Sequence, residues 1–418
     1  MEYSKKTKQE LIEECKSKKL KGYSNKKKEE LISLLTSSIE MNSKKDLGQY
    51  FTVSERLQRW VFDKTKNKDE ELLEPSFGAG HLLKPFIKYN KNYKMSCYEL
   101  DKSIKPVVTF SNQSINYGDF TNQTIDKKFK TIIGNPPYVK QKSSQNLYIK
   151  FIEICFNLLD TSGELIFIVP SDFIKLTSSS KLIDKMIKAG SFTDFLFPHD
   201  ESLFEGASVD VVVFRYEKDL KTKNVLVNDE NKICNVTNGI ITFSDKEITG
   251  ELLETHFNVY VGIVSGKDDV YKNELGNINV LSDKNKIDKF ICISEFPSGE
   301  EEIDEYLEKS KEELMKRKIR KFTEKNWFEW GALRNMKTVE ENMGKPCIYV
   351  RNMTRQKEVA FKDKVQYFGG SLLCLIPKTD KVDLDKVIKI LNSEEFQENY
   401  KYAGRFKIGQ KQVCNIIL

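Results

Sequence analysis

The stretch that most restricts how this chain can fold is TIIGNPPYVK, residues 131–140, where an apolar run ends in Gly-Asn and two prolines follow. Proline has no backbone N–H, so a central strand cannot continue through it. The apolar run is therefore predicted to be a buried strand that stops at Gly134. Asn135 and Tyr138 lie at its carboxyl end, and the two prolines hold the backbone there in a defined conformation.

Strand-like and helix-like segments alternate from about residue 46 to residue 217. The strand-like segments are ELLEPS, YKMSCYEL, KTIIGN, GELIFIVPS and ASVDVVVFRYEK, and helical patterns such as LYIKFIEICFNLL separate them. This alternation predicts an α/β fold with a doubly wound, Rossmann-like sheet, and the almost wholly apolar strands indicate parallel strands that are covered on both faces. After about residue 220, mixed strands and a long charged helix predict a second domain of α+β type, with Trp327 and Trp330 in its core.

The first 45 residues are basic, with 12 lysines and 7 acidic residues. Two short helical patterns, TKQELIEECKSK and KKKEELISLLTS, are joined by a turn that carries Gly22. This segment resembles a SAP domain, a small DNA-binding helical module. The resemblance rests on Leu11, Leu20, Gly22, Lys27, Leu31 and Ile32. It implies that Lys26, Lys27 and Lys28 face phosphate; the alternative is a helical hairpin that packs on the next domain.

A glycine loop follows the first predicted strand in LLEPSFGAG, residues 72–80. Gly78 and Gly80 allow a ligand to approach the backbone closely, and Glu74 lies at the strand end. About 20 residues later the second strand ends in CYELD, where Glu99 can accept hydrogen bonds from ribose hydroxyls. The same arrangement could bind NAD. The missing third glycine of a dinucleotide site and the Asn-Pro-Pro-Tyr sequence argue against that cofactor.

Asn-Pro-Pro-Tyr after a strand, downstream of such a loop, resembles amino-methyltransferases that use S-adenosylmethionine. The exocyclic amine of a purine is a poor nucleophile because its lone pair is delocalised into the ring. The Asn135 side-chain oxygen and the Pro136 carbonyl could accept its hydrogens and favour the tetrahedral nitrogen of the transition state. Pro136 and Pro137 would hold these acceptors in place, and Tyr138 would stack on the planar base.

The order of motifs over residues 46–418 resembles the gamma-class, TaqI-type DNA adenine-N6 methyltransferases. The matching segments are DLGQYFT at residues 46–52, GDF at residues 118–120, and LFEGASVDVVVFRY. The resemblance implies that the methionine end of the cofactor lies near Tyr50, Phe51, Thr52, Glu74, Ser76, Gly78 and Gly80. It implies that Glu99 binds the ribose, that Asp119 and Phe120 hold the cofactor's adenine, and that Asn135 lies beside the cofactor. Phe204 matches the aromatic residue that stacks on the flipped target base, with Phe197 as the rival position.

The expected function is therefore site-specific adenine methylation of double-stranded DNA. The expected domains are residues 1–40, the SAP-like module; 41–220, the catalytic domain; and 221–418, the target-recognition domain. The cations placed toward DNA in the last of these are Lys267, Arg351, Arg355, Arg405 and Lys407. We expect a monomer inside the cell, in the cytoplasm, with no metal and no membrane association, and the class allows a cognate restriction endonuclease as a partner. Three alternatives stay open: an RNA adenine methyltransferase, a protein-glutamine methyltransferase, and an inactive DNA-binding homologue.

Overall fold

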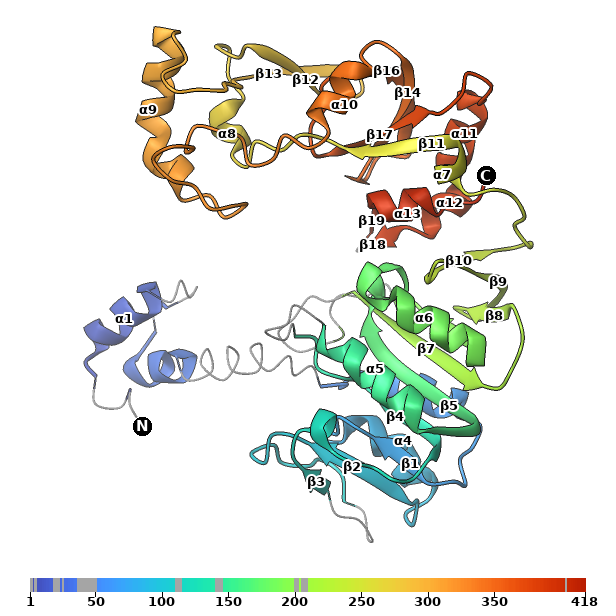
Figure 1. The fold of residues 1–418 in the computed structure, drawn as a ribbon. Helices are drawn as coiled ribbons and strands as arrows, with labels where there is room; N and C mark the ends of the chain where they lie inside the picture. Colours follow the sequence, from blue (N-terminus) through green and yellow to red (C-terminus); the bar gives the residue numbers. More distant parts are fainter. Residues whose placement is uncertain are drawn as a thin grey trace. The chain divides into compact units, whose positions relative to one another are not determined.

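The computed structural model describes residues 3, 6–17, 23–24, 26–35, 51–109, 115–139, 146–198, 203, 210–402 and 404–418. The chain divides into two compact units, residues 1–239 and residues 240–418 (Figure 1). The division falls beyond the expected boundary at residue 220, because β8 (Asn224–Val227) pairs with β6 (Gly190–Leu196) of the first unit and β9 (Glu230–Thr237) pairs with β8. No described helix combines the length and the apolar character needed to cross a membrane.

The first helix, α1 (Lys8–Ser17), begins with a capping box in the sequence TKQE. The Thr7 N–H donates to the Glu10 carboxylate at 2.6 Å, and the Glu10 N–H donates to the Thr7 hydroxyl at 3.3 Å. Residues 28–35 form a second helix, and its Leu31 and Leu35 are buried against Leu11. The predicted pair of short helices is therefore present, whereas Leu20 and Gly22 of the SAP resemblance lie outside the described residues.

The sheet of the first unit has the order β9-β8-β6-β7-β5-β4-β1-β2-β3. Its remaining strands are β1 (Leu72–Glu74), β2 (Met95–Glu99), β3 (Ile115–Tyr117), β4 (Phe129–Gly134), β5 (Leu159–Pro170) and β7 (Val211–Lys218). Strands β1 to β5 pair in parallel, and β7 lies antiparallel between β5 and β6. A dinucleotide-binding sheet has the order 3-2-1-4-5-6 without such an insertion. The α/β prediction is confirmed, and the inserted antiparallel strand distinguishes this doubly wound sheet from a dinucleotide-binding sheet.

Helices cover both faces of this sheet. The helical segments are α3 (Glu55–Lys64), η2 (His81–Leu83), α4 (Lys84–Tyr89), η3 (Phe120–Asn122), α5 (Leu147–Leu158), η4 (Ser171–Lys175) and α6 (Thr177–Ala189). Val61 of α3 and Phe86 of α4 share one core cluster with Ile133 and Ile166 of the sheet. Ile132 points to the opposite face because side chains alternate along a strand, and it is also fully buried. Figure 1 shows α5 and α6 lying across one face of the strands.

A buried ion pair joins β5 to β7, and its carboxylate also holds the loop that follows α3. Arg215 is 1% exposed and its Nη2 lies 2.7 Å from Oε2 of Glu164, which is fully buried. The Glu164 carboxylate also accepts from the backbone N–H groups of Lys66 and Asn67, at 2.9 and 2.8 Å. Because a buried charge is costly unless it is paired and hydrogen-bonded, these contacts lock three segments together.

The second unit is mixed α+β, as the sequence predicts. Its antiparallel sheet has the order β11-β17-β14-β16, and two smaller sheets are β12-β13 and β15-β19-β18. The strands are β10 (Ile240–Ser244), β11 (Phe257–Val261), β12 (Ile278–Asp283), β13 (Lys286–Phe290), β14 (Pro346–Arg351), β15 (Met353–Thr354), β16 (Ala360–Lys364), β17 (Leu372–Pro377), β18 (Lys401–Tyr402) and β19 (Arg405–Lys407). The helices are α7 (Leu253–His256), α8 (Asp268–Tyr271), α9 (Glu301–Met315), α10 (Met336–Glu341), α11 (Leu384–Leu391), α12 (Glu394–Glu398) and α13 (Gln410–Cys414). Trp327 and Trp330 are buried in one core cluster, as expected.

Candidate active site

The candidate site lies where the strand order reverses in the first unit. From β1 the chain moves to β2 on one side, and after β3 it returns to β4 on the other side of β1. In an open parallel sheet, ligands bind outside the carboxyl ends of the strands at such a switch point. The sequence places Glu74 at the end of β1, Glu99 at the end of β2, and Asn135 directly after β4. The fold therefore brings three of the predicted site residues to one edge of the sheet.

The glycine loop after β1 adopts a backbone that side chains would obstruct. Gly78 and Gly80 have φ angles of +56° and +80°, in the left-handed region that favours glycine. A Cβ on Gly80 would lie 2.6 Å from the Phe77 and Val108 side chains, and one on Gly78 would lie 3.1 Å from the Phe51 ring. Phe51 therefore covers the loop, which places the predicted residues 51 and 52 at the site.

Glu99 ties this loop to the end of β2. Its Oε2 accepts from the Gly78 N–H at 2.6 Å, and its Oε1 accepts from the Asp101 N–H at 2.8 Å. The carboxylate is buried, with 9% exposure. Each carboxylate oxygen has a second lone pair, so Glu99 can still accept from a ligand hydroxyl while it holds the loop.

Glu74 is the most strongly perturbed acid at the site. It is 2% exposed, and its Oε2 is buried without a hydrogen-bond partner among the described residues. Its Oε1 has only long contacts with the Ser76 N–H and hydroxyl, at 3.4 and 3.3 Å. Burial raises the pKa of the Glu74 carboxyl well above its usual range, the Ser76 hydrogen bonds oppose this rise, and the nearby Glu99 adds to it.

Asp119 and Phe120 form the start of η3, next to the end of β3. The Asp119 carboxylate caps this turn, with Oδ1 accepting from the Thr121 N–H at 2.9 Å and Oδ2 accepting from the Asn122 amide at 2.9 Å. Phe120 is 3% exposed and stacks on Phe151 with ring centroids 5.3 Å apart. The Asp119 side chain is therefore held by local bonds, and the Phe120 ring belongs to the core beside the site.

The Asn-Pro-Pro-Tyr segment follows β4 as the sequence predicts, and its amide is held on both sides. Asn135 Nδ2 donates to the Thr52 hydroxyl at 3.0 Å, and the Tyr138 hydroxyl donates to Asn135 Oδ1 at 2.5 Å. The Tyr138 hydroxyl also lies 3.0 Å from the Ile168 carbonyl oxygen in β5. An amide oxygen has two lone pairs, so Asn135 Oδ1 can accept a further hydrogen while it bonds Tyr138.

Sequence reasoning did not identify Gln58, which supports this arrangement from α3. Gln58 is 4% exposed, and its Nε2 donates to the Thr52 carbonyl oxygen at 2.7 Å and to the Val53 carbonyl oxygen at 3.3 Å. The available signal was a polar residue three positions before Val61, on the buried side of the helix. A buried glutamine must find partners, so its position on that side indicates a specific contact.

Two predicted site residues lie outside the described residues, and three others contact protein side chains. Tyr50 and Phe204 lie outside the described residues. Phe197 is half-buried, and its ring stacks on Phe195 with an interplanar angle of 16°. Lys267 pairs with Asp269 at 2.5 Å and with Glu313 at 2.6 Å. Arg351 is 5% exposed, and its Nε lies 2.7 Å from Oδ1 of Asp283.

Arg405 and Lys407 share one face of the small sheet β15-β19-β18. In the antiparallel register Met353 lies opposite Lys407, and Tyr402 lies opposite Arg405. Residues directly opposite one another share a face, so all four side chains lie on the same side. Lys407 Nζ lies 4.7 Å from the centroid of the Tyr402 ring, and Met353 is 52% exposed.

We call the side chains of Met353, Tyr402, Arg405 and Lys407 the small-sheet face. Within the described part of the chain, neither of its two cations forms an ion pair with a carboxylate. Phe406 points the other way and is buried in the core of the unit. Arg355 is exposed directly after β15. Lys26, Lys27 and Lys28 precede and begin the second amino-terminal helix, where Lys27 and Lys28 are exposed.

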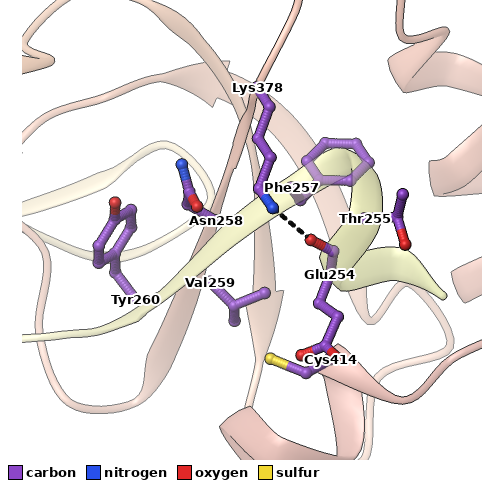
Figure 2. A pocket seen from close by; sticks show the side chains of 8 residues that line it. All are labelled: Glu254, Thr255, Phe257, Asn258, Val259, Tyr260, Lys378 and Cys414. Carbon is purple, nitrogen blue, oxygen red and sulfur yellow. Dashed lines mark hydrogen bonds between the residues drawn. The ribbon is translucent and has the colours of Figure 1, made fainter.

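The second unit also carries an open groove of about 460 Å³ beside β11 (Figure 2). Its lining residues are Glu254, Thr255, Phe257, Asn258, Val259, Tyr260, Lys378 and Cys414. Lys378 Nζ donates to the Glu254 carbonyl oxygen at 2.6 Å. Burial raises the pKa of the Cys414 thiol and Glu254 adds to this, so the thiol is a poor nucleophile. The described residues include no cluster of His, Cys, Asp and Glu that could hold a metal.

The sheet order and the site at its switch point define a Rossmann-like methyltransferase fold. Residues 55–204 match the family described as Eco57I restriction-modification methylase. The Type II methyltransferase M.HincII of Haemophilus influenzae is 29% identical over 267 residues, which cover 59% of this chain and 50% of that protein. The Type II methyltransferase M.AccI of Acinetobacter calcoaceticus is 23% identical over 254 residues, which cover 51% of this chain and 46% of that protein. The chain thus spans about half the length of these curated relatives, and is similar to Type II restriction-modification methyltransferases through this part.

A solved structure shares the fold over most of the chain. It is the Type IIL restriction-modification enzyme MmeI in complex with DNA, with a TM-score of 0.55 at 8% sequence identity. The match covers 90% of this chain and 65% of that one. At this identity the likeness concerns the fold alone.

S-adenosylmethionine is the cofactor of the Rossmann-like methyltransferase fold, and the residues at the switch point fit its chemistry. This molecule carries a sulfonium and an ammonium cation, and the ends of β1 and β2 present the carboxyl groups of Glu74 and Glu99. The unpartnered Oε2 of Glu74 leaves an acceptor for a cationic group.

Proposed function

We propose that this chain transfers the methyl group of S-adenosylmethionine to N6 of an adenine within a short sequence of duplex DNA. The observation that carries this proposal is the amide of Asn135, held at the carboxyl end of β4 beside the glycine loop and Glu99. The similarity to Type II methyltransferases supports DNA as the substrate.

In this reaction the protein must orient and polarise a weakly nucleophilic amine. S-adenosylmethionine supplies the electrophilic methyl group. Asn135 Oδ1 and the Pro136 carbonyl oxygen accept the two amine hydrogens, which favours the tetrahedral nitrogen that develops during transfer. Pro136 and Pro137 hold the segment in one conformation, so little reorganisation is needed during the reaction. The proton can leave late, and no strong base is required at the amine.

An adenine that stays stacked inside a duplex cannot reach Asn135, so the base must be flipped out of the helix. We propose that Tyr138 stacks on one side of the flipped ring. Phe204 supplies the other side by its family position, and Phe197 is the alternative.

The cofactor lies along the ends of β1 to β3 in this proposal. Glu99 accepts from the ribose hydroxyls, Asp119 and Phe120 hold the adenine, and Glu74 faces the methionine end. The remaining contacts on the methionine end come from Tyr50, Phe51, Thr52, Ser76, Gly78 and Gly80. Asn135 lies between the cofactor and the target base.

The DNA contacts of the second unit belong to the small-sheet face together with Arg355. The unpaired cations of this face attract phosphate, and the exposed Met353 and the half-buried Tyr402 offer apolar contact. Lys267 and Arg351 are less suited to phosphate, because carboxylates already neutralise them. The amino-terminal helices add sequence-independent affinity as a SAP-like module. A cognate restriction endonuclease would be a partner in the cell.

The decisive experiment expresses the chain in bacteria that lack DNA methylation and maps modified bases across the genome by single-molecule sequencing. We expect N6-methyladenine at one short sequence and at no other. An Asn135→Ala variant expressed in parallel is the control and should give no modification. A genome without modified adenine, together with methylated RNA or a methylated glutamine in the same cells, would contradict the proposal. Absence of all methylation would favour an inactive DNA-binding homologue.

A further inference from the structure

Gln58 and Thr52 connect the segment that covers the glycine loop to the amide of the Asn-Pro-Pro-Tyr motif. Phe51 packs on Gly78, and the next residue, Thr52, receives a hydrogen bond from Asn135 Nδ2 at 3.0 Å. Gln58 bonds the Thr52 carbonyl oxygen at 2.7 Å, so α3 fixes the backbone that carries this hydroxyl. Thr52 and Gln58 are each 4% exposed, which means that water does not compete with these bonds.

We infer that Gln58 is a positioning residue that acts through Thr52 to set the orientation of the Asn135 amide for methyl transfer. The inference rests on the proposed function, because it concerns the same amide. Without the Thr52 hydroxyl, Asn135 Nδ2 loses this acceptor, while the Tyr138 hydroxyl still bonds Oδ1 on the other side of the amide. Without Gln58, the hydroxyl remains but its backbone can shift, and a shift of about 1 Å in a reacting geometry can lower a rate by about 10²-fold.

The arrangement also couples the two halves of the site. Residues 51 and 52 are adjacent, and one contacts the glycine loop while the other contacts the catalytic amide. A ligand that presses on the loop therefore acts on the same short segment that orients Asn135.

The test uses two near-isosteric variants that each remove one hydrogen-bonding group. Gln58→Met removes the amide donor, and Thr52→Val removes the hydroxyl. Each should lower kcat by about 10-fold to 10²-fold, corresponding to about 1.4–2.7 kcal/mol, and leave KM for duplex DNA within about two-fold. Thr52→Ser keeps the hydroxyl and should restore most of kcat. Glu55→Gln, an exposed change on the same helix, is the matched control and should behave like the unmodified chain.

The double variant decides whether the two residues act in one pathway. Once Thr52 lacks its hydroxyl, the additional change Gln58→Met should lower kcat by less than about two-fold, because the element that Gln58 positions is already lost. Independent effects that multiply would overturn the inference. If Gln58→Met does not fold, the comparison of Thr52→Val with Thr52→Ser decides, and equal rates for those two would overturn it as well.

Two readouts do not depend on turnover. The side-chain amide NMR signal of Asn135, identified by its loss in Asn135→Ala, should shift in Gln58→Met and in Thr52→Val but not in Glu55→Gln. The fluorescence of 2-aminopurine placed at the target adenine should stay as high as with the unmodified chain, because flipping precedes the step that Asn135 serves. If the unmodified chain methylates duplex DNA but the amide signal is the same in the two variants, the inference about Gln58 is wrong and the proposed function is still supported. An unmodified chain that methylates no duplex would overturn both the inference and the proposed function.

Discussion

At the scale of single residues, the Glu74 carboxyl should make the stability of the chain depend on pH. Burial raises its pKa in the folded chain, so it stays protonated at pH values where the unfolded chain has already ionised. The folded state then binds more protons than the unfolded state, and the free energy of unfolding falls as pH rises above the ordinary glutamate pKa. Glu74→Gln cannot ionise. Without cofactor, its melting temperature should exceed that of the unmodified chain by a few degrees at pH 8, and the difference should shrink at pH 5.

Glu71→Gln is the matched control for this prediction, because the pH dependence of stability that Glu71 contributes has the opposite sign. Burial raises the pKa of Glu71, but hydrogen bonds from Lys127 and Ser96 outweigh burial and lower it overall. Its contribution to stability is therefore present above the ordinary pKa and lost as pH falls. Glu71→Gln should lower the melting temperature at pH 8 and have a smaller effect at low pH. Melting differences that do not change with pH for Glu74→Gln would show that this carboxyl is ionised in the folded chain.

The amide of Asn135 gives the second prediction at this scale. Asn135→Ala removes the acceptor proposed for the target amine and should lower the rate of methyl transfer by about 10²-fold or more. Affinity for S-adenosylmethionine, measured by calorimetry, should change little, because the loop that Glu99 holds is not altered. A rate within a few-fold of that of the unmodified chain would remove the motif from the mechanism.

At the scale of elements, the sheet of the first unit depends on the ion pair between Arg215 and Glu164. Arg215→Met would leave the fully buried Glu164 without its charge partner, and breaking such a pair costs about 3–5 kcal/mol. Chemical denaturation should show this loss. Lys309→Met is the control, because Lys309 pairs with Glu305 on the surface, where an exposed pair contributes about 0–1 kcal/mol. Equal losses for the two variants would mean that the buried pair has no special role in stability.

The small-sheet face carries the second prediction at this scale. Changing Arg405 and Lys407 together to alanine should weaken binding to duplex DNA. The slope of log affinity against log salt should become shallower by about 0.9 for each phosphate contact removed. Lys362→Ala is the control, since Lys362 on β16 of the same unit is already paired with Asp385 of α11. If the control and the double variant bind DNA equally well, this face is not the DNA surface.

At the scale of the whole molecule, the amino-terminal helices should add affinity without sequence preference. Deleting residues 1–40 should weaken DNA binding more at low salt than at high salt, because phosphate contacts are screened and displaced by salt. The methylated sequence should stay the same, since base readout is assigned to the second unit. Salt titrations of the full and truncated chains on one duplex measure the first effect, and genome-wide mapping of N6-methyladenine measures the second. A changed methylation sequence would show that these helices take part in base readout.

The sequence determined those features that depend on the backbone chemistry of neighbouring residues. Two prolines ended β4 at Gly134, and the glycines at 78 and 80 formed a left-handed loop after β1, because these residue types restrict or release the backbone wherever they occur. The alternation of apolar strands and amphipathic helices was sufficient to predict the α/β sheet. The end of β9, and with it the limit of the first unit, could not be predicted, because it depends on β8 pairing with β6.

Only the tertiary structure decided which distant side chains meet. Asn135 and Thr52 are 83 residues apart in sequence, and Arg215 and Glu164 are 51 apart, so no local pattern indicates either contact. The sequence predicts Arg351 among the cations that face DNA, yet folding buries it against Asp283, 68 residues away. The physical reason is that a side chain's burial and charge partners are set by how elements pack, whereas its backbone preferences are set by its own chemistry. The sequence therefore located the segment proposed to orient the target amine, and packing supplied the residues that hold this segment in position.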